Sequence, residues 1–398
     1  MMKKYIVLAS LLAVLVAVFF LVGTVSARVA IDKGDSHKRV IAHSEEEISK
    51  AVSLGCRIVR EARTLKALRC PRGVAESLSL SEDVKVFALD DEKVGVLKSP
   101  QPSATSASAN QQIGADIVHA SGNTGIGRKI VVLDTGYNYN HPELSSSYLD
   151  GKDFVNDDND PMDDDGHGSH VSGIITADGI NPKAKGVAPD AGVIAGKVLD
   201  QNGSGYFSDV VAGIYWAIDG PDGVYGNADD FGADAINLSL GTSRPYTYKG
   251  FCDGVLPDLT NAVKYAVERN VTVVVAAGNN SSSGVSIPGC ISYSTTAGAV
   301  DSRDRVASFS SKGNALDITA PGVSIYSTVL GSGYASWSGT SMATPMISGV
   351  VGLVKNAHPA YTQAQIESKL FSTAKDLGSR GKDTSYGWGR VRANLAVK

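Results

Sequence analysis

The apolar residues after residue 113 come in short unbroken runs, separated by segments with helical spacing. Four of the runs have the length and composition of buried strands: 129–133, 193–199, 235–240 and 271–277. Helical patterns lie between them, at 208–219 and 259–270. Because strands that are apolar throughout are covered on both faces, this pattern predicts an α/β fold with a mostly parallel sheet.

Residues 38–97 carry a different pattern, in which strand-like runs surround two helical segments. The strand-like runs are 39–42, 58–59, 84–87 and 93–97. Ser44 followed by Glu47 predicts a helix whose first turn is capped by two reciprocal hydrogen bonds, and 74–80 is the second helical segment. We expect a small α+β domain here, without a cluster of catalytic residue types.

Between these regions, residues 100–110 are small, polar and low in complexity. Such a composition indicates a flexible linker that is open to proteolysis. The chain therefore divides into residues 1–27, 28–98, 99–110 and 111–398. A leader, a small domain, a cleavable linker and a large domain together form the layout of a zymogen.

The leader has the features of a secretory signal. Lys3 and Lys4 precede an apolar run over residues 5–23, and Val25-Ser26-Ala27 is typical of a cleavage site. The predicted protein is secreted after cleavage near Ala27. The apolar run is nearly long enough to cross a bilayer, so an uncleaved membrane anchor remains an alternative.

Charge and cysteine content narrow the function classes. The 398 residues carry a net charge of −4 and no basic stripe, which argues against nucleic acid as a partner. An even number of cysteines in an exported chain indicates disulfides. The simplest pairing is Cys56 with Cys70 and Cys252 with Cys290, with two pairs of free thiols as the alternative. The sequence contains no Cys-x-x-Cys motif, so the spacing of the cysteines does not indicate a metal site.

Candidate chemistry gathers where the predicted strands and helices meet. In parallel sheets, sites form at the carboxyl ends of strands, and Asp134 and Asn279 follow two of them. His167 and Ser341 each precede an apolar helical segment, at 171–177 and 346–354. Taken alone, Ser341 is most simply a helix N-cap. Acyl transfer, however, needs a nucleophile, a base, an orienting acid and oxyanion donors, which these four residues can supply.

Four ordered motifs make a family resemblance specific: residues 134–136, 167–173, 276–279 and 339–345. They resemble the signatures of the subtilisin-like serine proteases, over roughly residues 111–395, and the order Asp, His, Ser is that of subtilisin. The resemblance implies a three-layer fold preceded by a small ferredoxin-like propeptide. It implies a broadly specific serine endopeptidase in which Asp134 orients, His167 is the base, Ser341 is the nucleophile and Asn279 serves the oxyanion. His170 is then structural, and Ser169 stands where threonine is usual.

The same resemblance implies the substrate site. Two segments pair with an extended peptide, Gly203-Ser204-Gly205 and Ser239-Leu240-Gly241, and Ala276-Ala277-Gly278 lines the specificity pocket. Taken alone, residues 203–205 are equally an ordinary turn. The implied partners are protein or peptide substrates and the chain's own propeptide, which acts as an intramolecular inhibitor of a monomer. We expect cleavage between about Leu97 and Asn110.

Two acidic segments point to Ca²⁺ as a cofactor, because a cation that bridges carboxylates relieves their repulsion. The predicted ligands are Asp153, Asn156, Asp158 and Asp160 in the first segment and Asp219, Asp222 and Asp229 in the second. A solvated acidic loop is the alternative for both. By the resemblance, Glu143 and residues 178–184 occupy the family's tight calcium site, but this loop departs from the family pattern, and Asp317 holds a weaker cation.

Three rival classes fit the sequence less well. An aspartic protease needs a second Asp-Thr/Ser-Gly besides Asp134-Thr135-Gly136, and the chain has none. A zinc hydrolase would use His167 and His170, whose spacing lacks the His-Glu-x-x-His pattern. A non-catalytic binding module would not need the complete set of Asp134, His167, Asn279 and Ser341.

Overall fold

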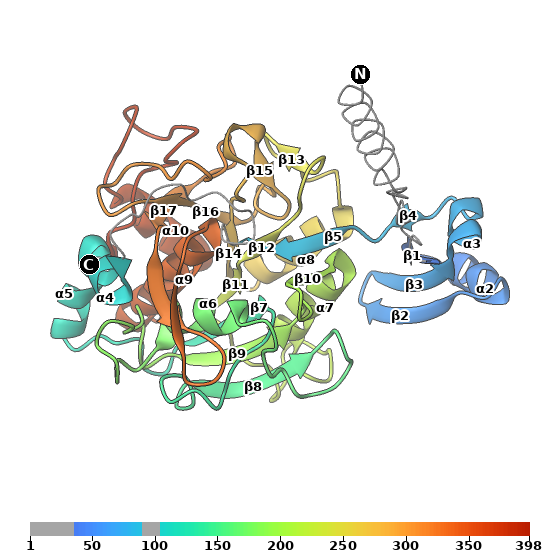
Figure 1. Ribbon diagram of the computed structural model, residues 1–398, viewed down its shortest axis with the longest axis horizontal. Helices are drawn as coiled ribbons and strands as arrows, with labels where there is room; N and C mark the ends of the chain where they lie inside the picture. The colour runs from blue at the N-terminus through green and yellow to red at the C-terminus, as the bar shows by residue number, and fades with distance from the viewer. Residues whose placement is uncertain (1–35, 90–103) are drawn as a thin grey trace, which may run out of the picture.

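The computed structural model describes residues 36–89 and 104–398, which form a small N-terminal unit and a large α/β body (Figure 1). The predicted signal at 1–27, the predicted strand at 93–97 and the first part of the predicted linker lie outside the described residues. No helix within the described ranges is both long and apolar enough to span a bilayer.

The body is built on a seven-stranded parallel sheet, which confirms the α/β prediction. Its spatial order is β17-β16-β14-β11-β7-β9-β8. In chain order the strands are β7 Lys129–Asp134, β8 Tyr148–Asp153, β9 Gly192–Lys197, β11 Ala235–Leu238, β14 Thr272–Ala276, β16 Thr295–Val300 and β17 Ile318–Pro321. The four predicted strands β7, β9, β11 and β14 lie together at its centre, where both faces are buried.

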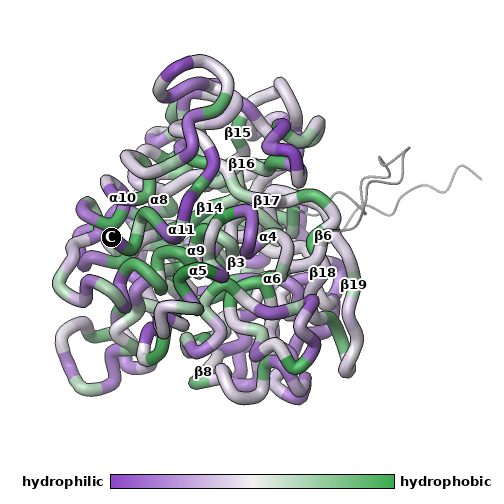
Figure 2. The backbone as a smooth tube through the Cα atoms, turned by 90° about the vertical axis from the view of Figure 1, so that its left-hand side faces the viewer, coloured by the Kyte–Doolittle hydropathy of each residue, from purple (hydrophilic) through white to green (hydrophobic). Residues whose placement is uncertain are grey.

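Helices cover both faces, so the body has three layers. Along β7, Val131 and Leu133 pack with α7 Phe207–Asp219 and α8 Pro257–Val267, whereas Ile130 and Val132 pack on the opposite side. That side holds α6 His167–Thr176 and α9 Thr340–Ala357. It also holds α4 Ser106–Ile113, α5 Ala115–Ala120, α10 Gln363–Ser372 and α11 Ala393–Ala396. Figure 2 shows hydrophobic α9 inside the molecule and hydrophilic stretches in the outer loops.

The N-terminal unit is a four-stranded sheet with two helices on one face, as expected for a small α+β domain. Its strand order is β2-β3-β1-β4, with β1 His37–Ala42, β2 Arg57–Ala62, β3 Leu65–Pro71 and β4 Ser81–Glu82. The helices are α2 Glu45–Ser53, which has the predicted capping box from Ser44, and α3 Arg72–Ser77. Both predicted disulfides, Cys56–Cys70 and Cys252–Cys290, are formed.

The two faces of this small sheet have different partners. Val40 and Ala42 pack with α2 and α3 in a small separate core. Ile41, Leu65 and Ala67 point the other way and join the core that contains α7 of the body. Successive side chains of a strand point to opposite faces of a sheet. One face of this sheet therefore packs on α2 and α3, and the other packs on the body.

Strand β5, Lys85–Ala88, leaves the small unit and enters the body (Figure 1). It lies between β10 Ser204–Tyr206 and β12 Leu240–Gly241 and is antiparallel to both. The strand predicted at 84–87 therefore exists, but it belongs to a sheet of the body and not to the small domain. This pairing decides how the functional site is occupied.

The end of the predicted linker is folded. Ala104–Thr105 forms β6, which pairs with β18 Ile325–Thr328, and helix α4 follows at once. Thr105 caps this helix by accepting a hydrogen bond from Ser108 N. The small polar residues of this segment do not reveal the helix in the sequence. A third strand, β19 Tyr334–Trp337, completes this sheet, and β13 Thr247–Tyr248 pairs with β15 Val285–Ser286.

Candidate active site

The carboxyl end of β7 and the start of α6 bring Asp134 and His167 together. His167 Nδ1 lies 2.7 Å from Asp134 Oδ1, and both side chains are fully buried. Because a carboxylate oxygen accepts, Nδ1 is the donor, which fixes the orientation of the ring. Burial raises the pKa of Asp134, and the adjacent imidazole opposes that rise. This arrangement holds an imidazole with Nε2 available as a base.

Ser341 lies at the second position of α9, among backbone N–H groups that have no partner within the helix. It is not the helix cap, because the N-cap is Gly339 and the Ser341 side chain accepts from no backbone N–H of this helix end. Ser341 Oγ donates to Ser239 O at 2.8 Å and accepts from Leu89 N at 3.1 Å. The N-cap interpretation of Ser341 is therefore excluded.

Asn279 follows β14, and its side-chain amide is fixed from one side. Its Oδ1 atom accepts hydrogen bonds from Thr340 N at 3.0 Å and Thr340 Oγ1 at 2.9 Å. Its Nδ2 atom consequently faces the opposite way and donates to Leu89 O at 2.9 Å. The Leu89 carbonyl oxygen thus lies at the Asn279 amide, which the sequence predicts as an oxyanion donor, next to the Ser341 hydroxyl.

The group in this site is the chain's own residue Leu89. Ala88 N donates to Gly203 O at 2.9 Å, and Leu89 N donates to Ser239 O at 3.4 Å. Phe87 lies opposite Ser204 on one side and Gly241 on the other. The segments 203–205 and 239–241 therefore enclose an extended peptide in the manner the sequence suggested, and residues 85–89 are that peptide.

The residues expected to line a specificity pocket lie behind this groove. Ala276 and Ala277 are fully buried, and Gly278 has a φ of 105°. A Cβ atom at Gly278 would lie 2.4 Å from Ser286 Oγ, so a side chain there is excluded. A cavity of about 360 Å³ borders Ala88 and Leu89 and reaches Thr242 and Asn280. Ala276, Ala277 and Gly278 do not line this cavity, so their place in a specificity pocket stays a prediction.

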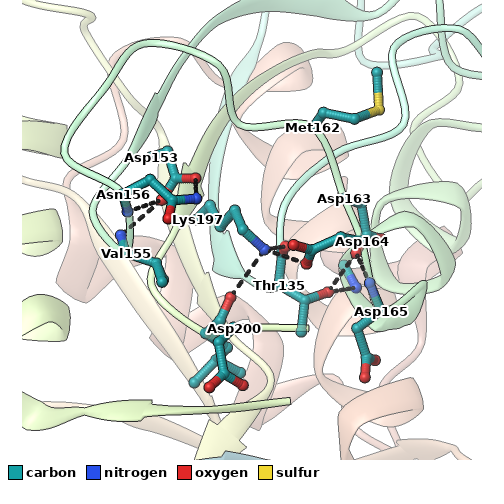
Figure 3. Close-up of polar contacts among 12 residues, drawn as sticks. Thr135, Asp153, Val155, Asn156, Met162, Asp163, Asp164, Asp165, Lys197 and Asp200 are labelled. Atoms are coloured by element: carbon teal, nitrogen blue, oxygen red, sulfur yellow. Dashed lines mark hydrogen bonds and ion pairs between the residues drawn. The ribbon is translucent and has the colours of Figure 1, made fainter. Parts of the chain in front are cut away.

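Two buried charged residues near Asp134 and His167 are not among the residues that the sequence analysis predicts for the site. Asp163 bonds to Thr135, and the Lys197 ammonium pairs with Asp164 and donates to Thr135 O at 2.7 Å (Figure 3). Asp163 belongs to the first acidic segment, residues 153–165, for which the sequence predicts calcium. Lys197 lies inside the predicted buried strand 193–199, and a lysine at such a position is the available signal.

His170 lies on α6 near His167, but its ring has different partners. Its fully buried ring stacks on Trp337 at 4.6 Å, and Nε2 lies 3.1 Å from both Ile325 O and Ala335 O. Burial lowers the pKa of His170 to about 3, so the ring is neutral at ordinary pH. These contacts agree with a structural role.

The first acidic segment does not assemble a metal site in the described residues, where no three metal-ligating side chains come together. Asp153 accepts hydrogen bonds from Val155 N, Asn156 N and Asn156 Nδ2 (Figure 3). Asp158 accepts from Asp160 N, and Asp160 accepts from the Tyr139 hydroxyl. These carboxylates turn towards local donors instead of a shared centre.

In the second acidic segment one feature fits a cation. Asp219 is engaged by the Tyr265 hydroxyl and by Arg63 of the N-terminal unit. Asp222 and Asp229 are linked through Asp222 N, which donates to Asp229 Oδ2 at 3.1 Å. Asp230 Oδ1 is buried and accepts no hydrogen bond. An acceptor in that state is the kind of atom that a cation satisfies.

At the other two predicted cation sites, the carboxylates already bind a lysine or hydrogen-bond donors of the protein itself. Asp317 pairs with Lys382 at 2.8 Å and accepts from Thr296 N, so its charge is already balanced. Glu143 is fully buried, and its oxygens accept hydrogen bonds from three successive backbone N–H groups, at residues 179–181, and from the Tyr334 hydroxyl. Because N–H groups cannot ligate a cation, this carboxylate does not fit the family's tight calcium site.

Comparison with known proteins gives one consistent result. A family model described as the subtilase family matches residues 125–389. A thermophilic serine proteinase from Bacillus sp. (strain AK1) is 40% identical over 272 residues, which are 68% of this chain and 62% of that protein. Subtilisin from Bacillus pumilus is 38% identical over 292 residues, 72% of this chain and 97% of the relative. An alkaline protease from Alkalihalobacillus alcalophilus is 35% identical over 377 residues, 92% of this chain and 87% of the relative.

Proposed function

The chain belongs to the subtilase family of serine endopeptidases, and from this premise we propose that it is an exported protease made as a self-processing zymogen. In this proposal residues 28–89 are the propeptide and the body that begins by Ala104 is the peptidase. The observation that carries the proposal is the contact of Leu89 O with Asn279 Nδ2, beside Ser341 Oγ.

The chemistry follows from the roles of four side chains. Ser341 Oγ attacks the carbonyl carbon while His167 Nε2 takes its proton, and Asp134 stabilises the resulting imidazolium. Asn279 Nδ2 and Ser341 N bind the oxyanion. The C–N bond then breaks, His167 gives its proton to the leaving amine, and an acyl-enzyme remains on Ser341. Water, activated by His167, hydrolyses this ester and restores the enzyme.

We assign the first substrate as the bond between Leu89 and Asp90. The carbonyl held at Asn279 is that of Leu89, so the bond on its carboxyl side is the one attacked. Asp90 itself lies outside the described residues. The sequence-based expectation of cleavage between about Leu97 and Asn110 is the alternative to this assignment. That expectation rests on linker composition, whereas the proposed bond rests on the contact of Leu89 O with Asn279.

The propeptide is proposed to stay bound after cleavage and to inhibit the enzyme. Strand β5 is paired on both sides, and the small sheet packs on α7 through Ile41, Leu65 and Ala67. Buried ion pairs add to this contact, for example Arg60 Nε with Asp209 Oδ1 at 2.7 Å. A substrate-like segment that is held by a folded unit blocks the groove until that unit leaves.

For later substrates we propose broad specificity with a preference for apolar residues before the cut bond. The contacts of residues 87–89 with the groove use backbone atoms at Gly203, Ser239 and Gly241, which place no demand on sequence. Leu89 occupies the site with its side chain buried. The natural protein substrates are those that can present such an extended segment.

Export, calcium and a monomeric state complete the proposal. The apolar leader and two disulfides favour an oxidising extracellular compartment. Calcium is proposed for the segment 219–230, where Asp222, Asp229 and the partnerless Asp230 Oδ1 would move together to hold it, since no three such side chains meet in the described residues. It would supply stability to this loop and take no part in peptide hydrolysis.

A serine-directed phosphonyl fluoride tests the catalytic assignment. We expect the mature enzyme to lose peptidase activity as one phosphonyl group is added, and peptide mapping to place that group on Ser341. Ser341→Ala is the matched control and should be inactive and unlabelled. Activity that survives in Ser341→Ala, or a label that maps elsewhere, would show that the proposed function is wrong.

A further inference from the structure

Asp163 is a buried carboxylate with an unusually complete set of donors (Figure 3). Its Oδ1 atom accepts from Thr135 Oγ1 at 2.8 Å, Gly166 N at 2.9 Å and Asp165 N at 3.1 Å. Its Oδ2 atom accepts from Ser169 Oγ at 2.6 Å and Ser169 N at 2.8 Å. Five donors on one acceptor-only group leave it no freedom to reorient.

These donors come from the two elements that carry the acid and the base. Thr135 directly follows Asp134 at the end of β7, and Gly166 and Ser169 flank His167 at the start of α6. Thr135 Oγ1 also accepts from Gly168 N at 2.8 Å, so the same hydroxyl is tied to both sides. A rigid bridge therefore runs from β7 through Asp163 to α6.

We propose that Asp163 is a positioning residue that holds the Asp134 carboxylate and the His167 imidazole in their catalytic arrangement. The inference rests on the proposed function, because it assigns Asp134 and His167 the roles of orienting acid and base. Asp163 touches neither the substrate nor the reacting atoms; it acts through Thr135 and through the first turn of α6.

The charge of Asp163 matters in addition to its shape. The carboxylate lies at the N-terminal end of α6, where the helix dipole favours a negative group. Its negative charge acts on Asp134: it raises the pKa of that carboxyl, although by less than burial does. The same negative charge favours the imidazolium that forms during the reaction. Removal of the charge should therefore make protonation of His167 harder.

Asp163→Asn tests this inference in the mature enzyme released from the full chain. The amide keeps the size of the side chain but loses the charge. Its NH₂ group also faces N–H or O–H donors at one of the two former oxygen positions, where it cannot accept their hydrogen bonds. We expect kcat to fall about 10- to 100-fold with KM within about twofold, since small misplacements of catalytic groups have effects of this size. The acidic limb of the kcat/KM profile should move to lower pH.

Asp150→Asn is the matched control, because Asp150 is an exposed carboxylate that accepts from the next backbone N–H, at Gly151. We expect it to keep the kcat and the pH profile of the wild type. A purely structural Asp163 would lower the melting temperature but leave kcat per folded molecule and the acidic limb unchanged. That result would overturn the inference.

Thr135→Val covers the case in which Asp163→Asn does not fold. It removes the hydroxyl that joins Asp163 to Gly168 and leaves the other donors of Asp163 in place. We expect kcat to fall in the same way and Thr135→Ser to restore most of it. Equal activity of the valine and serine variants would contradict the inference.

Phosphonyl fluoride labelling separates this inference from the proposed function. If wild-type Ser341 is not labelled, the proposed function itself fails. If the wild type is labelled and Asp163→Asn is labelled at the same rate, only the positioning role fails. A slower rate in Asp163→Asn, with the wild type labelled, supports both.

Discussion

At the scale of single residues, Asn279 and Asp163 differ in how far the sequence could predict them. Asn279 follows a predicted strand and belongs to a recognisable motif, so its place near Ser341 was expected. The partner that fixes its amide, Thr340, is 61 residues away in sequence and follows only from the structure. Asp163 was assigned to a calcium loop, because composition does not reveal which carboxylates are buried.

His170 provides a residue-scale test of pH dependence. Its pKa is lowered to about 3 in the folded protein by burial, whereas an unfolded histidine titrates near 6.5. Between these values the unfolded state binds more protons, so stability falls as the pH falls. At pH 5 this loss is about 2 kcal/mol. Ser341 is inactivated in both proteins for this measurement. Between pH 8 and pH 5, the melting temperature of His170→Gln should fall by fewer degrees than that of the wild type.

The absolute stability of His170→Gln is lower at every pH, since the contacts with Trp337 and two carbonyls are weakened. Parallel pH dependence in the wild type and His170→Gln would remove His170 as the source.

At the scale of elements, strands were predictable where the sheet buries both faces and not elsewhere. β7, β9, β11 and β14 are unbroken apolar runs and were expected. β8 and β17 were not, because Asp150 and Lys152 make β8 polar and Pro321 ends β17. Residues 106–110 of α4 fall in the predicted linker, since their small polar side chains resemble those of a flexible segment.

The loop at 178–184 shows how one element can replace a metal site by hydrogen bonds. It turns three successive backbone N–H groups towards Glu143. Glu143→Gln keeps the shape but places an amide donor among these donors. We expect a loss of about 3 kcal/mol in the free energy of unfolding, because hydrogen bonds to a charged group are among the strong ones. The melting temperature of the inactivated mature enzyme measures this effect.

Glu268→Gln is the control for this loop, because Glu268 is exposed at the C-cap of α8 and should tolerate the change. Addition of calcium should not restore the stability of Glu143→Gln, since the site offers donors and not ligands. Recovery with calcium would show that the loop rearranges into a metal site.

At the scale of the whole molecule, the two units contact each other where the groove binds β5 and where buried charged side chains form a cluster. Arg60 of the N-terminal unit bonds to Asp209 on α7, Asp157 and Phe154 O of the body. Arg39 bridges Asp83 and Asp209 in the same cluster. The sequence could predict two domains, but not that β5 would enter the body, because strand pairing between distant segments leaves no local pattern.

Arg60→Ala should weaken the hold of the propeptide on the processed enzyme. Removal of one partner from a buried pair costs about 3–5 kcal/mol, which corresponds to roughly a hundredfold or greater loss of affinity. After self-cleavage of the full chain, peptidase activity should therefore appear sooner than in the wild type. Lys50→Ala, on the exposed face of α2, should keep the wild-type delay. An unchanged delay in Arg60→Ala would argue against the cluster as an inhibitory contact.

The most direct test of the central claim is the N-terminal sequence and mass of the protein after it matures alone. The position of Leu89 between Asn279 and Ser341 predicts that the first mature fragment begins at Asp90 and that full-length Ser341→Ala stays uncut. Sampling early in maturation separates this first cut from later trimming. A first cut between residues 97 and 110, or normal maturation of purified Ser341→Ala, would contradict the account.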